Sequence, residues 1–275
     1  MGIIRTPRTN MKREGCRMLK FISKQLELDD HDNLNPSGRY HNFRDFMNFP
    51  NVGGKELEYD YMPPLSHPQI RTGRSILKAI DDNDILLHFP YHKFTDYINL
   101  LREAAIDPDV QYIKITLYRV AKNSRVISAL TNAVQNGKKV TVIIELQARF
   151  DENSNIYWAR QLEDIGAKVL FGIPGLKVHS KLTLITRKMG KRIRFYSVVG
   201  TGNFHEGNAA AYTDVSLLTT DQRIGREVNK LFDYFENPFK YPNFNHLLVS
   251  PQFMRRKVYA LIDEEMRNAK VGREA

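Results

Sequence analysis

The sequence has a single cysteine, Cys16, among its 275 residues. One thiol excludes an intrachain disulfide and a zinc cluster built on cysteine, and it suits a reducing compartment. Long apolar runs are also missing, because no uncharged stretch approaches the roughly 20 residues needed to cross a bilayer. The first residues lack the apolar core of a secretory signal. These absences favour a cytoplasmic protein and leave open a peripheral position at the inner face of the membrane.

The composition is that of an ordinary folded protein. Hydrophobic residues make up 42% and charged residues 26% of the chain, which excludes wholesale disorder. Lysine and arginine number 41 against 31 aspartates and glutamates, a net charge of +10. Such an excess favours a polyanionic partner, namely a nucleic acid, a phosphorylated ligand or an anionic membrane. Charge alone does not choose among these three.

The first 74 residues differ from the rest in their pattern of apolar and turn-forming residues. Apolar residues at helical spacing predict an amphipathic packing helix over about 10–27. From Leu28 to about Arg74 the sequence is rich in turn-forming residues, which indicates loops and short strands.

From Asp84 onward, short apolar runs alternate with amphipathic helices. Helical faces are indicated over 94–105, 126–133, 158–165 and 224–235, and Ser250-Pro251 is expected to open another helix. Strands are expected over 84–89, 112–118, 140–146, 168–171, 177–186, 193–199 and 214–218. The alternation predicts an α/β fold, with a mixed sheet flanked by helices on both sides.

The most informative segment is Pro174-Gly-Leu-Lys-Val-His179-Ser-Lys181. Because side chains alternate along a strand, His179 and Lys181 are expected on one face, with Val178 and Leu182 on the other. A neutral imidazole can attack phosphorus, and a neighbouring ammonium can hold a phosphate oxygen while favouring neutral histidine. The pair therefore indicates phosphoryl chemistry.

A second element, Gly200-Thr-Gly-Asn203, follows the next expected strand. Its glycines could expose backbone N–H groups to phosphate oxygens, and Asn203 adds an amide side chain. A tight turn would explain the glycines equally well. His205 lies just beyond this turn and is a further candidate to reach the site.

Together these two elements resemble the phospholipase D superfamily pattern His-x-Lys-x4-Asp followed by Gly-Ser/Thr-x-Asn. Thr186 stands where that pattern has aspartate. With Ile115-Thr-Leu-Tyr-Arg119-Val-Ala, Glu145-Leu-Gln-Ala-Arg149-Phe-Asp-Glu and Tyr212-Thr-Asp, the resemblance narrows to one family. The chain resembles the bacterial polyphosphate kinases, which make inorganic polyphosphate from ATP, and nearly its whole length takes part.

The resemblance implies a phospholipase D-like fold and reversible transfer of the terminal phosphate of ATP to polyphosphate, through a phosphohistidine and with Mg²⁺. His179 matches the phosphorylated histidine, Tyr212 a nucleotide-contacting position, and Arg119 and Arg149 arginines tied to magnesium. Since a guanidinium cannot ligate a cation, we expect both arginines to grip phosphate oxygens that hold the metal. With Lys181 and Asn203, these residues form the expected site.

The resemblance also implies a division of the chain. Residues 1–68 match the end of a head domain, 69–248 the first catalytic domain, and 249–275 the start of a second catalytic domain. On this reading half of the active-site cleft lies outside the chain, so we expect little or no turnover by the chain alone. Full-length members are expected to form oligomers, and no nucleic acid is expected as a partner.

Two alternatives remain at this point. A phospholipase D-like phosphodiesterase or nuclease would use His179 as nucleophile and would need a second such motif, supplied by dimerisation. A non-enzymatic polyanion-binding module would depend on the positive charge alone, with binding that weakens steeply as salt rises.

Overall fold

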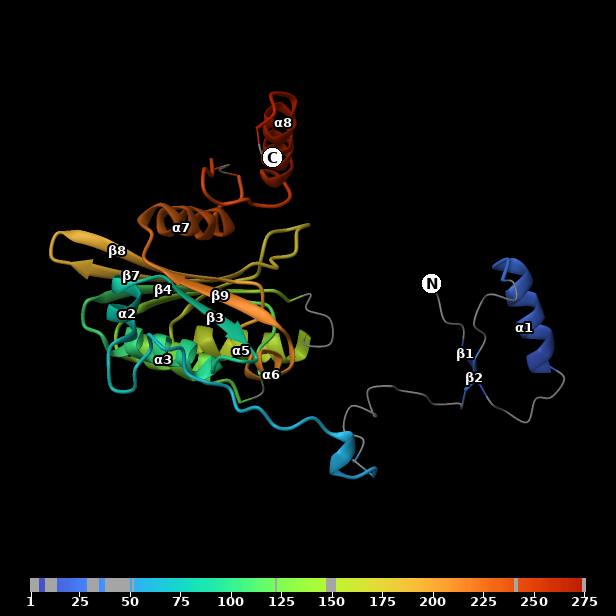
Figure 1. Ribbon diagram of the computed structural model, residues 1–275. Coiled ribbons are helices and arrows are strands. Elements are labelled where there is room, and N and C mark those ends of the chain that lie inside the picture. The colour runs from blue at the N-terminus through green and yellow to red at the C-terminus, as the bar shows by residue number, and fades with distance from the viewer. Residues whose placement is uncertain are drawn as a thin grey trace. The chain divides into compact units, whose positions relative to one another are not determined.

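The computed structural model describes residues 5–7, 14–28, 35–37, 50, 52–121, 123–146, 152–239 and 242–273. The chain divides into two compact units, Met1–Tyr61 and Met62–Ala275. Figure 1 traces the chain in colour from its N-terminus to its C-terminus.

The first unit contains a helix and two short parallel strands. They are β1 (Arg5–Pro7), α1 (Glu14–Gln25) and β2 (Asn35–Ser37), followed by a 3-10 turn, η2 (Lys55–Leu57). The helix expected over 10–27 is confirmed from Glu14 onward, and residues 10–13 lie outside the described residues. Met18 and Leu26 remain 63% and 57% exposed, so the expected packing role is not seen in the described part of this unit.

The second unit is built on one seven-stranded mixed sheet, in the order β3-β9-β8-β7-β4-β5-β6. Strands β4, β5 and β6 are parallel, while β7, β8, β9 and β3 each run antiparallel to their neighbours. The strands are β3 Ile85–Phe89, β4 Val110–Leu117, β5 Lys139–Ile144, β6 Lys168–Leu170, β7 Lys181–Met189, β8 Arg192–Gly200 and β9 Asp214–Thr219. The expected α/β class and mixed sheet are confirmed.

Helices cover both faces of this sheet, as Figure 1 shows. One face packs against α2 (Ile76–Asp82), α3 (Phe94–Ile106), α4 (Arg125–Gln135), α5 (Glu152–Asp164) and α6 (Glu206–Ala211). The other face packs against α7 (Gln222–Glu236), whose Val228 and Phe232 belong to one buried apolar cluster with Leu182 and Leu184 of β7. The sheet therefore separates two buried apolar clusters.

The last helix, α8 (Met254–Lys270), buries none of its residues. No helix in the described part of the chain is both long and apolar enough to span a membrane.

Two expected boundaries are wrong. Strand β7 begins at Lys181 rather than Lys177, because the residues before it bond to side chains and not to a neighbouring strand. Helix α8 begins at Met254 rather than Ser250, after a turn in which Phe253 N donates to Val249 O. Helices α2 and α6, with seven and six residues, are too short for the spacing of apolar residues to have revealed them.

Gly225 of α7 allows the helix to approach the sheet closely. A Cβ at this position would lie 2.4 Å from Cβ of Phe195 on β8. We expect Gly225→Ala to lower the free energy of unfolding by about 1–3 kcal/mol, since overpacking forces the helix away from the sheet. Urea denaturation measures the change. Arg226→Ala, exposed on the same helix, is the control and should stay within about 0.5 kcal/mol of the parent chain; equal stability of both variants would contradict the close packing.

Candidate active site

The candidate site lies at one edge of the sheet, where β4, β5 and β8 end and β7 and β9 begin. This arrangement follows from the pairing, because β7 is antiparallel to both β4 and β8. Lys181, the first residue of β7, pairs with Gly200, the last residue of β8. Side chains just outside these strand ends are therefore brought together, at the kind of edge where open α/β sheets bind ligands.

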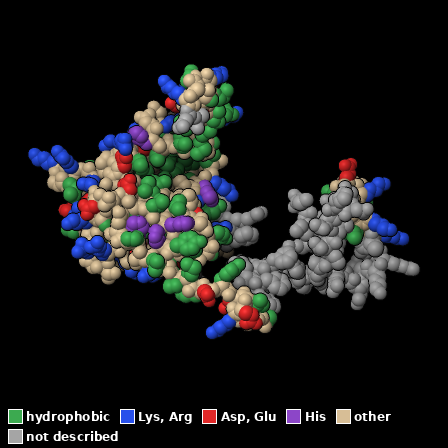
Figure 2. Space-filling view, in the orientation of Figure 1, with side chains coloured by type: hydrophobic (Ala, Val, Ile, Leu, Met, Phe, Trp, Pro, Cys, Tyr) green, Lys and Arg blue, Asp and Glu red, His purple; other side chains and the backbone are tan. Residues whose placement is uncertain are grey.

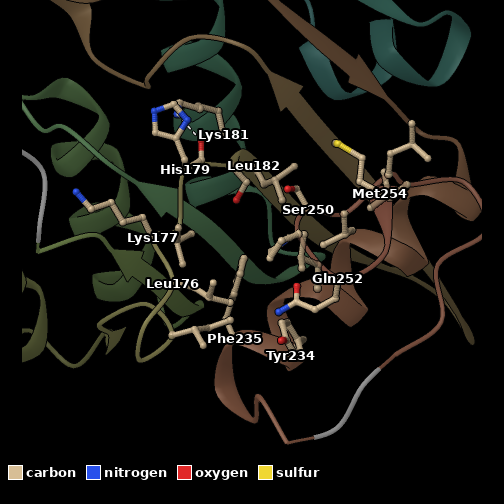
Figure 3. Close-up of a pocket in the computed structure, with 18 of the residues that line it drawn as sticks. Leu176, Lys177, His179, Lys181, Leu182, Tyr234, Phe235, Ser250, Gln252 and Met254 are labelled. Atoms are coloured by element: carbon tan, nitrogen blue, oxygen red, sulfur yellow. Dashed lines mark hydrogen bonds between the residues drawn. The ribbon is translucent and has the colours of Figure 1, made fainter. Parts of the chain in front are cut away.

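His179 and Lys181 come together as the sequence predicts. Lys181 Nζ lies 3.0 Å from His179 Nδ1 and also donates to the carbonyl oxygen of His179. His179 is exposed, whereas Lys181 is only 5% exposed. Val178 and Leu182 join the apolar cluster under α7, as expected for side chains that alternate with the pair. In Figure 3 the imidazole and the amine lie side by side at one end of a cavity.

Burial shifts the pKa of both groups. It lowers the pKa of the Lys181 ammonium to about 8, although the charge of Asp214 acts in the opposite direction. Burial, followed by the charge of Lys181, also lowers the pKa of His179. At neutral pH the imidazole is therefore uncharged and keeps a lone pair, while most of Lys181 carries its proton.

Tyr118 contacts both members of the pair, and the sequence analysis did not identify it. Its ring meets that of His179 edge-on, with 4.8 Å between centroids, and Lys181 Nζ lies 5.2 Å from the Tyr118 centroid. A cation over an aromatic face is attracted by the electrons of the ring. The feature of the sequence that could have identified Tyr118 is its position between the end of β4 and Arg119.

Two buried side chains hold the segment that carries the pair. Thr116 Oγ1 donates to Ser180 O at 2.7 Å and accepts from Leu182 N at 2.9 Å. Glu145 Oε2 accepts from Val178 N at 2.8 Å. These bonds replace strand pairing before β7 and fix the backbone on both sides of the lysine. Both side chains lie in motifs that the sequence analysis quoted, but it gave neither a role.

The glycine turn at 200–202 is fixed against β9. A Cβ on Gly202 would lie 2.5 Å from Cγ of Asp214. Thr201 N donates to Val215 O, and Thr201 Oγ1 donates to Asp214 Oδ1 at 2.7 Å. The expectation of an open backbone cradle is therefore wrong for Thr201, whose N–H is already bonded, and Gly202 serves close approach to β9.

The remaining candidates differ in how they are placed. Asn203 follows the turn, and its Oδ1 is buried with no hydrogen bond from any described residue. Arg119 is half-buried two residues beyond the end of β4, and Arg149 lies outside the described residues. Tyr212 directly follows the last residue of α6 and is 62% exposed, so its ring is not packed into the core.

His205 has a structural role at the start of α6. Its Nδ1 accepts a hydrogen bond from Asn208 N at 3.2 Å and so caps the helix. One ring nitrogen is thereby engaged, whether or not the residue also reaches the site.

A cavity of about 540 Å³ opens beside the pair on the α7 side of the sheet (Figure 3). Its walls are largely apolar, and Leu176, Phe235 and Met254 contribute to them. Buried Glu227 of α7 shapes one wall, because it accepts from the backbone N–H groups of residues 245–247. Burial alone would raise the pKa of Glu227, but these bonds lower it, so the carboxylate stays ionised near neutral pH.

Magnesium was expected at this site from the resemblance. Within the described residues, no group of three or more histidine, cysteine, aspartate or glutamate side chains is arranged to hold a metal. The guanidinium of Arg119 has only N–H hydrogen-bond donors and cannot ligate a cation. This donor set fits Mg²⁺ that arrives on phosphate oxygens and not Mg²⁺ held in an all-protein cage.

The site thus consists of an exposed, uncharged imidazole beside a buried ammonium, at one edge of a mixed sheet. Residues 75–241 match the family model described as polyphosphate kinase C-terminal domain 1. The chain belongs to the polyphosphate kinase family.

Individual relatives agree with this assignment. The chain is 50% identical to the polyphosphate kinase of Vibrio cholerae over 258 residues, and 48% identical to that of Escherichia coli K12 over 260 residues. The crystal structure of polyphosphate kinase from Porphyromonas gingivalis matches with a TM-score of 0.74 and 38% identity, covering 87% of this chain and 40% of that one. The two sequence matches cover 94% and 93% of this chain but 37% of each relative.

Thr116 provides a test of how the pair is held. We expect Thr116→Val to lower the free energy of unfolding by about 1–3 kcal/mol, because Ser180 O and Leu182 N lose a buried partner. We also expect the pKa of His179 to rise toward its ordinary value as Lys181 moves away. NMR titration of the imidazole and urea denaturation measure the two effects. Thr116→Ser keeps the hydroxyl and should restore both; an unchanged His179 pKa in the valine variant would show that the clamp does not position the pair.

Proposed function

We propose that this chain carries the phosphoryl-accepting half of a polyphosphate kinase site, with His179 as the group that is phosphorylated. The observation that carries the proposal is the 3.0 Å contact between Lys181 Nζ and His179 Nδ1 beside an exposed imidazole. The phosphoryl group would pass between ATP and inorganic polyphosphate in either direction.

In the first step a ring nitrogen of His179 attacks the terminal phosphorus of ATP. A P–N bond forms as the bond to the bridging oxygen breaks, and ADP leaves with that electron pair. Because Lys181 contacts Nδ1, Nε2 is the nitrogen available for attack. When a phosphate oxygen takes over the ammonium, Nδ1 can carry the ring proton while Nε2 keeps its lone pair.

In the second step a terminal oxygen of polyphosphate attacks the phosphohistidine. The P–N bond breaks, its electron pair returns to the imidazole, and the chain grows by one phosphate. Lys181 supports both steps, since its buried ammonium faces negative charge that grows on the transferring oxygens. Only the protonated form of Lys181 can stabilise this charge.

Other candidates receive roles that follow from their chemistry. Arg119 and Arg149 would bind the phosphate oxygens, and Mg²⁺ would neutralise part of their charge when bound to the same oxygens. Asn203 would donate from its amide to the transferring group. Tyr212, exposed at the end of α6, would contact the base of the nucleotide.

The domain division expected from the sequence remains part of the proposal. Residues 69–248 would form the first catalytic domain, following the end of a head domain and preceding a second catalytic domain that begins at 249. On this basis the chain alone would go no further than phosphorylation of His179. Full turnover and assembly into oligomers would require the complete protein. The reaction would take place in the cytoplasm, where ATP is available.

Phosphorylation of His179 can be measured by intact mass after incubation with Mg²⁺ and either ATP or polyphosphate. We expect one acid-labile phosphoryl group on the parent chain and none on His179→Ala. A C-terminally extended chain is the companion sample, because the isolated chain would lack any group supplied from outside it. Failure of both samples to form the adduct would overturn the phosphohistidine proposal.

The lowered pKa of Lys181 predicts a pH dependence. Its ammonium is present below about pH 8 and is lost above it, so ATP affinity should weaken as the pH rises through about 8, well below the usual lysine range. Binding titrations between pH 6.5 and 9.5 measure this step. Lys181→Arg keeps its charge throughout and should remove the step; the same step in both proteins would assign it to another group.

A further inference from the structure

A second hollow, of about 560 Å³, lies beside α2 in the second unit. Three cationic side chains line it, Arg71, Arg74 and Lys78, against a single carboxylate, Asp82. All four side chains are exposed to solvent. Figure 2 shows basic side chains gathered over this part of the molecule. The hollow therefore combines a concave shape with an excess of positive charge.

This hollow is distinct from the site at His179. Helix α2 leads into β3, whose first residue, Ile85, pairs with Leu218, whereas Phe89 at its other end pairs with Asp214 beside the active-site edge. In Figure 1, α2 lies toward the hairpin end of β7 and β8, away from the end where α6 lies. The hollow thus borders the opposite end of the sheet.

The backbone that carries the three cations is well defined. Arg74 N donates to Arg71 O, closing a turn that contains Gly73 at a φ of 77°. Ser75 then caps α2 by accepting from Lys78 N at 2.9 Å. Three side chains of α2 are buried in the core, Ile76, Leu77 and Ile80. The cations therefore project from a turn and a helix that are anchored beneath them.

Arginines on neighbouring elements form ion pairs with aspartates, whereas these three cations form none with any described residue. Arg187 pairs with Asp107 at 2.9 Å and with Asp109 at 3.3 Å, and Arg194 pairs with Asp81 at 2.9 Å. Among the described residues, no ion pair involves any of the three cations of the hollow. An excess of positive charge on a concave wall raises the potential there and attracts anions.

The lining favours one class of anion. It contains no aromatic side chain, so it offers no surface on which a nucleic-acid base could stack. Three cations along a turn and a helix suit a flexible linear anion with charge on every unit. We propose that this hollow is a second binding site for the polyphosphate chain, distant from His179. The inference rests on the proposed function, since it assumes polyphosphate as a substrate.

The test compares two variants that remove equal charge. The first is Arg71→Gln/Arg74→Gln/Lys78→Gln. The second, the matched control, is Lys188→Gln/Lys191→Gln/Arg192→Gln, at exposed positions of the hairpin formed by β7, β8 and the turn between them. Fluorescence anisotropy with labelled long-chain polyphosphate at several salt concentrations gives the affinity and its salt dependence for each, after circular dichroism has checked the fold.

We expect the hollow variant to bind long chains roughly tenfold more weakly, and its slope of log affinity against log salt to fall by about 2, at about 0.7 for each lost contact. The control should retain most of the affinity, and phosphorylation of His179 should be unchanged in the hollow variant. Parent-like affinity in the hollow variant, or an equal loss in the control, would overturn the site.

Single-stranded RNA of matched charge is the competing ligand. If the hollow variant lost RNA binding while keeping polyphosphate binding, the site would belong to nucleic acid and the proposal would be wrong. Because the phosphorylation assay is read separately, a failed hollow test with a phosphorylated His179 would remove only this inference. An absent phosphohistidine would instead count against the proposed function.

Discussion

The candidate site depends on an ammonium that is taken out of water. Lys181 is 5% exposed, and burying a charge without partners costs far more free energy than a domain can spare. The structure compensates with His179 Nδ1, a carbonyl oxygen, the face of Tyr118 and the charge of Asp214. Compensation is incomplete, which is why the pKa of the lysine falls. Phosphate oxygens would complete it, so the same burial that weakens the resting cation favours an anionic ligand.

The surrounding strands are arranged to keep that ammonium in place. Position 181 starts a strand with neighbours on both sides, and the preceding backbone bonds to side chains of β4 and of the residue after β5. Here Glu145 and Thr116 provide the hydrogen bonds that a neighbouring strand provides elsewhere in the sheet. Asn155 of α5 joins the two strand ends, since its amide donates to Tyr118 O and to Glu145 O. Thr116 and Glu145 thus hold the backbone that carries the imidazole, and Asn155 links the chain segments that follow β4 and β5.

The sequence predicted the parts of this arrangement that depend on local pattern. Alternating apolar runs placed every strand of the sheet to within a few residues, and the His-x-Lys spacing identified the pair. It could not predict Thr116 or Glu145 as clamps, because their partners lie 33 to 66 residues away. It placed the start of β7 at Lys177, since an extended backbone alternates in the same way whether or not another strand pairs with it. The glycines at 200–202 were ambiguous for a similar reason, as close packing and anion binding both require a missing side chain.

Thr186 is the position at which this chain departs from the His-x-Lys-x4-Asp pattern of the superfamily. The residue is 6% exposed in the middle of β7, paired with Tyr112 on one side and Phe195 on the other. An aspartate there would be an ionised group between two aromatic neighbours, and burial would penalise its charge. The carboxylate that acts on Lys181 comes instead from Asp214 on β9, held by Thr201 of the glycine turn. The turn therefore contributes to the site through the acid that it orients, and the lysine keeps a negative neighbour although its own strand supplies none.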